Sequence, residues 1–121
     1  MIKKEGSKYD YAVLFLKENL KDRFYGNLKT NYEKKNCEIG DIVEIAGYPS
    51  LGTFKKTMFT GTGEVKSLEE SFIKHRVPTS LGQSGSPIMN KEGEAIGIHI
   101  GGFGDSNTGI KLNRAVRNFI E

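Results

Sequence analysis

Residues 82–87 read GQSGSP and stand directly before an apolar pair at residues 88–89. Glycine is costly in backbone entropy, so glycines on both sides of a Gln-Ser pair indicate unusual dihedrals or a close approach by another group. Ser84 is the residue that this loop presents. A serine hydroxyl becomes a nucleophile only with a general base to take its proton and with donors that stabilise an oxyanion. Backbone N–H groups at Gly82 and Ser84 could supply those donors.

Two interpretations of this loop stay open at this point: a nucleophile loop, or a glycine-rich turn that leads into a strand. The pattern is not the hydrolase elbow G-x-S-x-G, because Ser86 occupies the place of the last glycine and no helix follows.

The composition is typical of a globular chain, without a strong excess of charged or of apolar residues. With 121 residues it is long enough for a core, and we expect residues 1–121 to form a single domain. The net charge of +3 is spread among interspersed acidic and basic residues, so we expect neither nucleic acid nor a membrane as a partner. No signal peptide is visible at the start. Cys37 is the only cysteine, which excludes an internal disulfide and favours a small buried side chain.

Short periodic segments separated by turn residues predict an all-β fold, either an antiparallel sandwich or a barrel. Asn113 is expected to cap a terminal helix with Ala115, Val116, Phe119 and Ile120 on one stripe. The polar stretch 17–39 reads as a long connection. The expected strands are residues 9–16, 41–47, 57–68 (with a bulge), 71–77, 86–89, 94–100 and 108–112, with turns at 48–52 and 90–93.

Three further side chains are candidates for chemistry. Asp10 interrupts the apolar run 9–16, where it is either a surface turn residue or a buried, hydrogen-bonded carboxylate. His99 lies between isoleucines and is either a core histidine or a pocket residue. His75 stands between Lys74 and Arg76 and is most simply a solvated strand residue. Because no ligand partner accompanies either histidine, we expect no metal and no cofactor.

Read together and in order, the motifs point to one family. They are YDYAVL from residue 9, IAGYP from residue 45, GQSGSP, EAIGIHIGG from residue 94 and VRNFI from residue 116. This set covers nearly the whole chain and resembles the trypsin/chymotrypsin-fold serine endopeptidases, with the glutamyl endopeptidase-like branch the most similar. The resemblance implies an antiparallel Greek-key β-barrel, the second barrel of a chymotrypsin-like protease, followed by a short C-terminal helix.

The resemblance also implies roles for residues of the reaction centre. Asp10 matches the triad aspartate and Ser84 the nucleophile, while Gly82 and Ser84 match the backbone donors of the oxyanion hole. Residue 83, just before the nucleophile, is Asp in the trypsin branch and an amide in the glutamyl branch; here it is Gln83. Activation in the manner of trypsin is therefore not expected.

Further roles concern the polypeptide substrate. Thr79 and His99 match the residues that face the side chain before the cut, which implies cleavage after Glu and leaves Asp open. Gly101 and Gly102 would pair with the substrate backbone by strand addition. Relatives of this kind are commonly secreted.

One member of the catalytic set is missing. In this family the triad histidine precedes the aspartate, and no histidine precedes Asp10. His75 is not expected to replace it, and His99 belongs to the pocket. The chain would therefore need an N-terminal barrel that carries the triad histidine, and alone it should be inactive. Three hypotheses follow: a serine endopeptidase, a non-catalytic pseudoprotease or peptide-binding module, and an unrelated small β-barrel.

Overall fold

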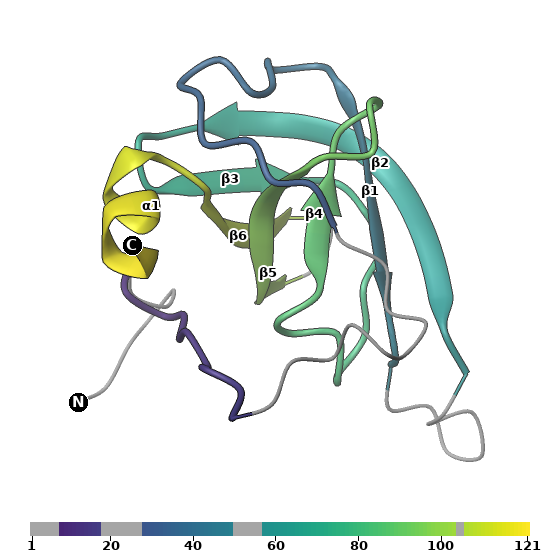
Figure 1. Ribbon diagram of the computed structural model, residues 1–121. Helices are drawn as coiled ribbons and strands as arrows, with labels where there is room; N and C mark the ends of the chain where they lie inside the picture. Colours follow the sequence, from purple (N-terminus) through teal and green to yellow (C-terminus); the bar gives the residue numbers. More distant parts are fainter. Residues whose placement is uncertain (1–7, 18–27, 50–56, 104–105) are drawn as a thin grey trace.

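The computed structural model describes residues 8–17, 28–49, 57–103 and 106–121. In these segments the strands close one antiparallel barrel, and a short helix follows the last strand (Figure 1). The all-β prediction with a C-terminal helix is therefore confirmed. The elements are β1 (Ile42–Gly47), β2 (Phe59–Leu68), β3 (Phe72–His75), β4 (Pro87–Met89), β5 (Ala95–Phe103), β6 (Ser106–Lys111) and α1 (Arg114–Ile120).

Strand alternation determines which side chains fill the barrel. In β1 the buried residues Val43 and Ile45 alternate with Ile42 and Glu44, which are exposed, as the two-residue period of a strand requires. β-Branched side chains suit this half-buried, pleated surface. The main core gathers side chains from β1 to β5 and from the segments beside them: Cys37, Val43, Ile45, Val65, Ile73, Val77, Ile88 and Ile96.

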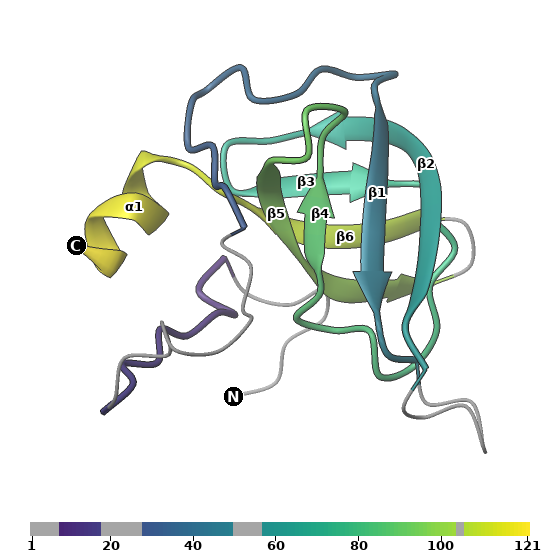
Figure 2. The ribbon, with the colours of Figure 1, turned by 45° about the vertical axis from the view of Figure 1, so that its right-hand side comes forward.

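The order of strands around the barrel is β1-β2-β3-β6-β5-β4, and β4 pairs again with β1. Figure 2 shows β1 between β2 and β4 at the near side of the barrel. Because β3 pairs with β6 and not with β4, the connection 76–86 has to cross from one part of the barrel to another. The GQSGSP loop lies in this crossing connection.

Most of the predicted strands are present within a few residues. β2 contains the expected bulge, seen as a register shift between Val65 and Ser67 against β3. The predicted turn at 90–93 is also confirmed, with Gly93 in the left-handed region at φ 77°. Of the turn predicted at 48–52, residues 50–52 lie outside the described residues.

The prediction of a strand at 9–16 was wrong. The described residues 8–17 are irregular, and they lie outside the ring of strands in Figure 1. Leu14 and Phe15 are 84% and 83% exposed. A continuous apolar run forms a strand only beside another strand that takes up its backbone hydrogen bonds, and the described part of the chain provides none here.

The terminal helix begins as predicted but buries less than predicted. The Asn113 side chain accepts a hydrogen bond of 2.9 Å from the N–H of Val116 and so caps α1. Val116 is buried, whereas Phe119 is 63% exposed and meets the ring of Tyr11 edge to face at 5.5 Å between centroids. Ile120 is also exposed, so only part of the expected apolar stripe reaches the core.

The segment 28–40 is irregular, as expected of a connection, and polar side chains fasten it to the β4–β5 hairpin. Nδ2 of Asn31 donates to Oε1 of Glu94 at 3.0 Å, and Nδ2 of Asn90 donates to the carbonyl of Asn36 at 3.4 Å. Cys37 is buried as predicted, and this burial raises the pKa of its thiol to about 11. Among the described residues no helix is long and apolar enough to cross a membrane.

Gly109 makes a clear test of core packing. A Cβ atom built there would lie 2.8 Å from the carbonyl oxygen of Ile98 and would also meet the Ile88 side chain. We expect Gly109→Ala to lower the free energy of unfolding by about 1–3 kcal/mol, because the β5–β6 backbone cannot move freely away. Urea unfolding measures the change, and Lys91→Ala in the exposed hairpin turn serves as the control. Equal stability of the two variants would contradict the packing described here.

Candidate active site

The loop around Ser84 is held in shape from within. The N–H of Gln83 donates to the carbonyl of Ser80 at 3.2 Å, and the N–H of Ser80 donates back to Oε1 of Gln83 at 2.7 Å. Gln83 is buried, so its amide acts as an internal brace of the loop. Gly82 and Gly85 have φ values of 94° and 91°, a left-handed conformation that side-chain-bearing residues rarely adopt. The two glycines are therefore needed for the shape of the loop.

Main-chain hydrogen bonds attach this loop to β5. The N–H of Gly85 donates to the carbonyl of His99 at 2.7 Å, and the N–H of His99 donates to the carbonyl of Ser86 at 2.8 Å. Ser84 stands one residue before this attachment and is exposed. Its Oγ lies 3.4 Å from the carbonyl oxygen of Ile100, at the limit of a hydrogen bond. The hydroxyl thus faces outward from a fixed loop.

The backbone amides of Gly82 and Ser84 have no hydrogen-bond acceptor among the described residues. Backbone N–H groups without a partner are uncommon in folded chains unless water or a ligand satisfies them. Both N–H groups are therefore available to an acceptor from outside the described residues.

The two histidines of the chain contact each other inside the barrel. Nε2 of His75 lies 3.2 Å from Nδ1 of His99, with the ring centroids 5.2 Å apart. Their exposed fractions are 0% for His75 and 2% for His99. The expectation that His75 is a solvated strand residue was wrong. β3 alternates, so Ile73, His75 and Val77 share the buried face; this period of two was the signal in the sequence.

The hydrogen bonds determine the tautomers of this pair. Nδ1 of His75 accepts from the backbone N–H of Val77 at 3.1 Å, so its proton is on Nε2. This Nε2–H then donates to Nδ1 of His99, which leaves the proton of a neutral His99 on Nε2. Among the described residues, nothing accepts this last N–H. The bond from the Val77 N–H to His75 and the bond from His75 to His99 thus leave the Nε2–H of His99 as the donor at the end of the chain of bonds.

Burial keeps both rings neutral. It lowers the pKa of His75 to about 4, and the neighbouring His99 adds to the effect. Burial also lowers the pKa of His99. Neither ring is hydrogen-bonded to Ser84, whose Oγ has the Ile100 carbonyl as its partner in the described part of the chain.

The remaining predicted residues are placed as follows. Asp10 is exposed in the irregular segment, and no hydrogen bond joins it to either histidine within the described ranges. Thr79 is half-buried on the loop that leads to Ser84. Gly101 and Gly102 lie in β5, where they pair with β6 on one edge. The structure thus connects the Ser84 loop to His99 through main-chain hydrogen bonds, and it joins neither Thr79 nor Asp10 to His99 by a hydrogen bond among the described residues. Its described residues contain no group of three or more His, Cys, Asp or Glu side chains that could hold a metal ion.

A closed antiparallel barrel with a serine loop braced in this way belongs to the chymotrypsin-like class. A family model described as a trypsin-like peptidase domain matches residues 3–98, and the chain belongs to this family. A solved structure of a Glu endopeptidase in complex with MPD is also similar, with a TM-score of 0.70 and 25% sequence identity. The match covers 78% of this chain and 46% of that one, so the chain spans less than half of that protein's length.

These matches confirm the resemblance drawn from the sequence motifs, and they exclude an unrelated small β-barrel.

The neutral histidine pair predicts a pH-dependent stability. The ordinary pKa of histidine is 6.5, and that of folded His75 is about 4. Between these values the unfolded chain binds protons that the folded chain does not, so the free energy of unfolding falls as the pH falls from 6.5 to 4. We expect a loss on the order of 1–3 kcal/mol from the pair. Urea unfolding at several pH values measures it.

His75→Gln should flatten this pH profile because it removes a titrating group. Lys74→Gln, one position away and on the opposite face of β3, controls for carboxylates that titrate in the same range. Identical profiles for both variants would contradict a neutral buried pair.

Proposed function

We propose that the chain carries the nucleophile, the oxyanion hole and the substrate cleft of a serine-type endopeptidase. The observation that supports this most is the Ser84 loop. Its hydroxyl is exposed, and the amides of Gly82 and Ser84 lack other acceptors in the described part of the chain. In the proposed reaction Ser84 Oγ attacks a peptide carbonyl carbon and passes its proton to a general base. The carbonyl oxygen becomes an oxyanion between the two amides, and the amine then leaves with a proton returned by the base.

The general base has to come from elsewhere in this proposal. The two histidines are buried and bonded to each other, which removes both as bases for Ser84. We infer that an N-terminal barrel supplies the base and that Asp10 orients it, as the triad aspartate would. The exposed apolar residues around it, Leu14, Phe15 and Leu16, give this neighbour a surface to cover. This chain alone is then expected to be inactive.

We further propose that the cleft prefers Glu before the cut. His99 offers one Nε2–H without an acceptor among the described residues, and Thr79 adds a hydroxyl from the adjoining loop. This N–H is therefore available to a ligand acceptor, and a carboxylate is the strongest acceptor that a side chain provides. His75 holds the donor of His99 in place. Aspartate, one methylene shorter, would reach this donor less well.

The substrate backbone has an available strand edge. β5 pairs with β4 only up to Ile98, beyond which residues 101–103 pair with β6 alone. An extended peptide could add to the open edge at Gly101 and Gly102, where the absence of side chains permits close approach. That edge continues directly from the Ile100 carbonyl beside Ser84. Addition there would bring a peptide carbonyl to the loop.

A second function also has support, namely a non-catalytic module that holds peptides in the same cleft. It is favoured by the position of the two histidines, because neither is placed to take a proton from Ser84. Such a module would keep the strand edge and the His99 donor and lack turnover.

Labelling by a fluorophosphonate distinguishes these two functions. We expect the probe to label Ser84 when the chain is joined to the proposed N-terminal barrel, because an activated serine attacks the phosphorus. Ser84→Ala should abolish labelling, whereas Ser80→Ala on the same loop should leave it intact. Mass spectrometry of the labelled peptide provides the readout. A correctly folded protein that takes up no label would support the binding module and reject the peptidase.

Peptide binding tests the preference for Glu without requiring turnover. Peptides that end in Glu should bind about tenfold or more tightly than matched peptides ending in Gln, since a charged hydrogen bond is worth about 1.5–3 kcal/mol. Isothermal titration calorimetry measures both. His99→Ala should remove the difference, and His75→Gln should reduce it. An undiminished preference in His99→Ala would show that the pocket is assigned to the wrong residue.

A further inference from the structure

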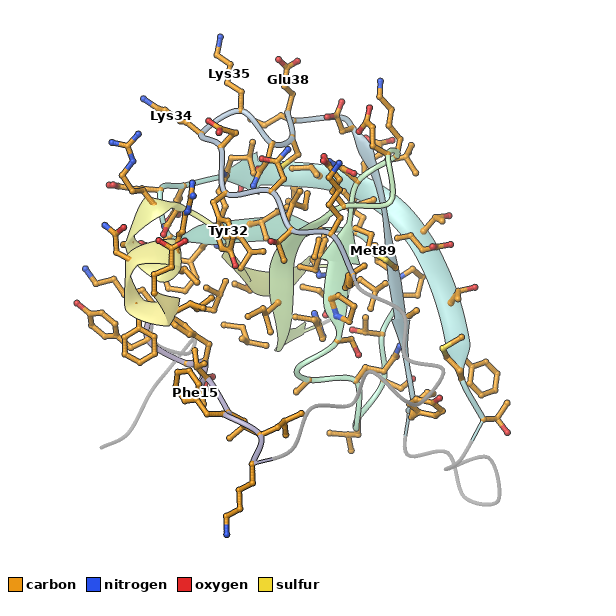
Figure 3. The ribbon with its side chains drawn as sticks, viewed as in Figure 1. Phe15, Tyr32, Lys34, Lys35, Glu38 and Met89 are labelled. Carbon is orange, nitrogen blue, oxygen red and sulfur yellow. The ribbon has the colours of Figure 1, made fainter. Side chains whose placement is uncertain are left out.

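A cavity of about 740 Å³ lies between α1, the irregular segment 28–40 and the β2–β3 turn. Its volume is within the range of sites for small molecules. None of its lining residues belongs to the Ser84 loop or to β5. Tyr32 and Leu68 contribute apolar wall, and Figure 3 shows Tyr32 and Lys34 on the irregular segment beside α1. The proposed peptidase site therefore leaves this cavity without a function.

Lys111, at the end of β6, is the unusual member of the lining. It is 5% exposed, and its Nζ donates one hydrogen bond of 3.2 Å to the carbonyl of Lys34. An ammonium group has three donors, and no carboxylate forms an ion pair with this one in the described part of the chain. Burying an ammonium without a countercharge is expensive. Accordingly, burial lowers the pKa of Lys111, and the neighbouring Cys37 opposes this.

Other cationic groups line the same cavity. Arg114 and Arg117 extend from α1, and Lys34 stands on the opposite segment. Nε of Arg117 already pairs with Glu121 at 3.2 Å. Arg114 makes no ion pair within the described ranges and can present its planar guanidinium to an oxyanion in a two-pronged contact. Lys111 and Arg114 thus line one cavity, and a single ligand could accept hydrogen bonds from both side chains.

Three carboxylates also line the cavity, at Glu33, Glu69 and Glu70. With the four cations they leave the lining only weakly positive. A polyanion would be repelled by all three carboxylates, so this lining disfavours it. A small anion that contacts Lys111 would meet less repulsion.

We propose that this cavity binds a small organic or inorganic oxyanion, carrying a carboxylate or a phosphate group, through Lys111 and Arg114. The bound oxyanion would occupy donors of Lys111 that the protein leaves without partners and would neutralise its charge. The cavity is then a ligand site that shares no lining residue with the Ser84 loop or β5, and it does not depend on the peptidase proposal.

Calorimetric titration of the chain with citrate and with inorganic phosphate, in sodium chloride of matched ionic strength, tests this site. We expect saturable binding of one ion per chain for at least one of the two. The ion that binds more tightly identifies a carboxylate or a phosphate as the preferred group. Lys111→Met and Arg114→Gln should each weaken binding about tenfold, as for the loss of one charged hydrogen bond. Lys91→Met, in the hairpin turn away from the cavity, should bind as the unaltered chain does.

Two results would overturn the proposal. One is the absence of saturable binding for both ions. The other is binding by Arg114→Gln that equals that of Lys91→Met. Arg114 is exposed, so its variant decides the question even where Lys111→Met fails to fold, which thermal unfolding would reveal.

Discussion

The site depends on the pair of main-chain hydrogen bonds that join His99 to Gly85 and Ser86. They fix the Ser84 loop to β5, so the position of the hydroxyl follows the barrel and not a free loop. The side chain of the same residue enters the barrel and bonds to His75 on β3. Because β5 and β3 are not neighbours but are separated by β6, this contact spans the barrel interior. His99 thereby links the backbone that positions Ser84, the proposed nucleophile, to the buried side chain of His75.

Patterns that depend on local chemistry were readable in the sequence. The cap at Asn113, the turn at Gly93 and the alternation in β1 each require only a few adjacent residues to be understood. The predictions that were wrong depend on partners that are distant in the sequence. The run at 9–16 looks like a strand, yet strands exist only in pairs, and its pairing could not be read from its own residues. His75 was predicted to be solvated because its neighbours are charged, although every second residue of β3 is buried.

Two neutral imidazoles suit the proposed recognition of a carboxylate better than one charged imidazole would. A buried imidazolium without a substrate would destabilise the fold, whereas the neutral pair keeps the bond from the Val77 N–H to His75 and the bond from His75 to His99. A carboxylate at His99 would raise the pKa of that ring, because a negative charge favours the protonated form. Binding at acidic pH would then take up a proton. The pair can thus hold a donor ready without the desolvation penalty of a permanent charge.

Under the proposed function, this barrel supplies some catalytic groups by itself and needs a neighbouring barrel for others. The proposed oxyanion donors and the proposed substrate edge of β5 are groups of the chain's own backbone. Proton transfer is different, because the proposed base lies beyond Asp10 and its exposed apolar neighbours. Covering Leu14, Phe15 and Leu16 would contribute roughly 1.5–3 kcal/mol for each side chain that becomes fully buried. That contribution would favour the proposed second barrel against this face, so the apolar run that failed as a strand prediction would serve, under the proposed function, as the surface that the base-carrying barrel covers.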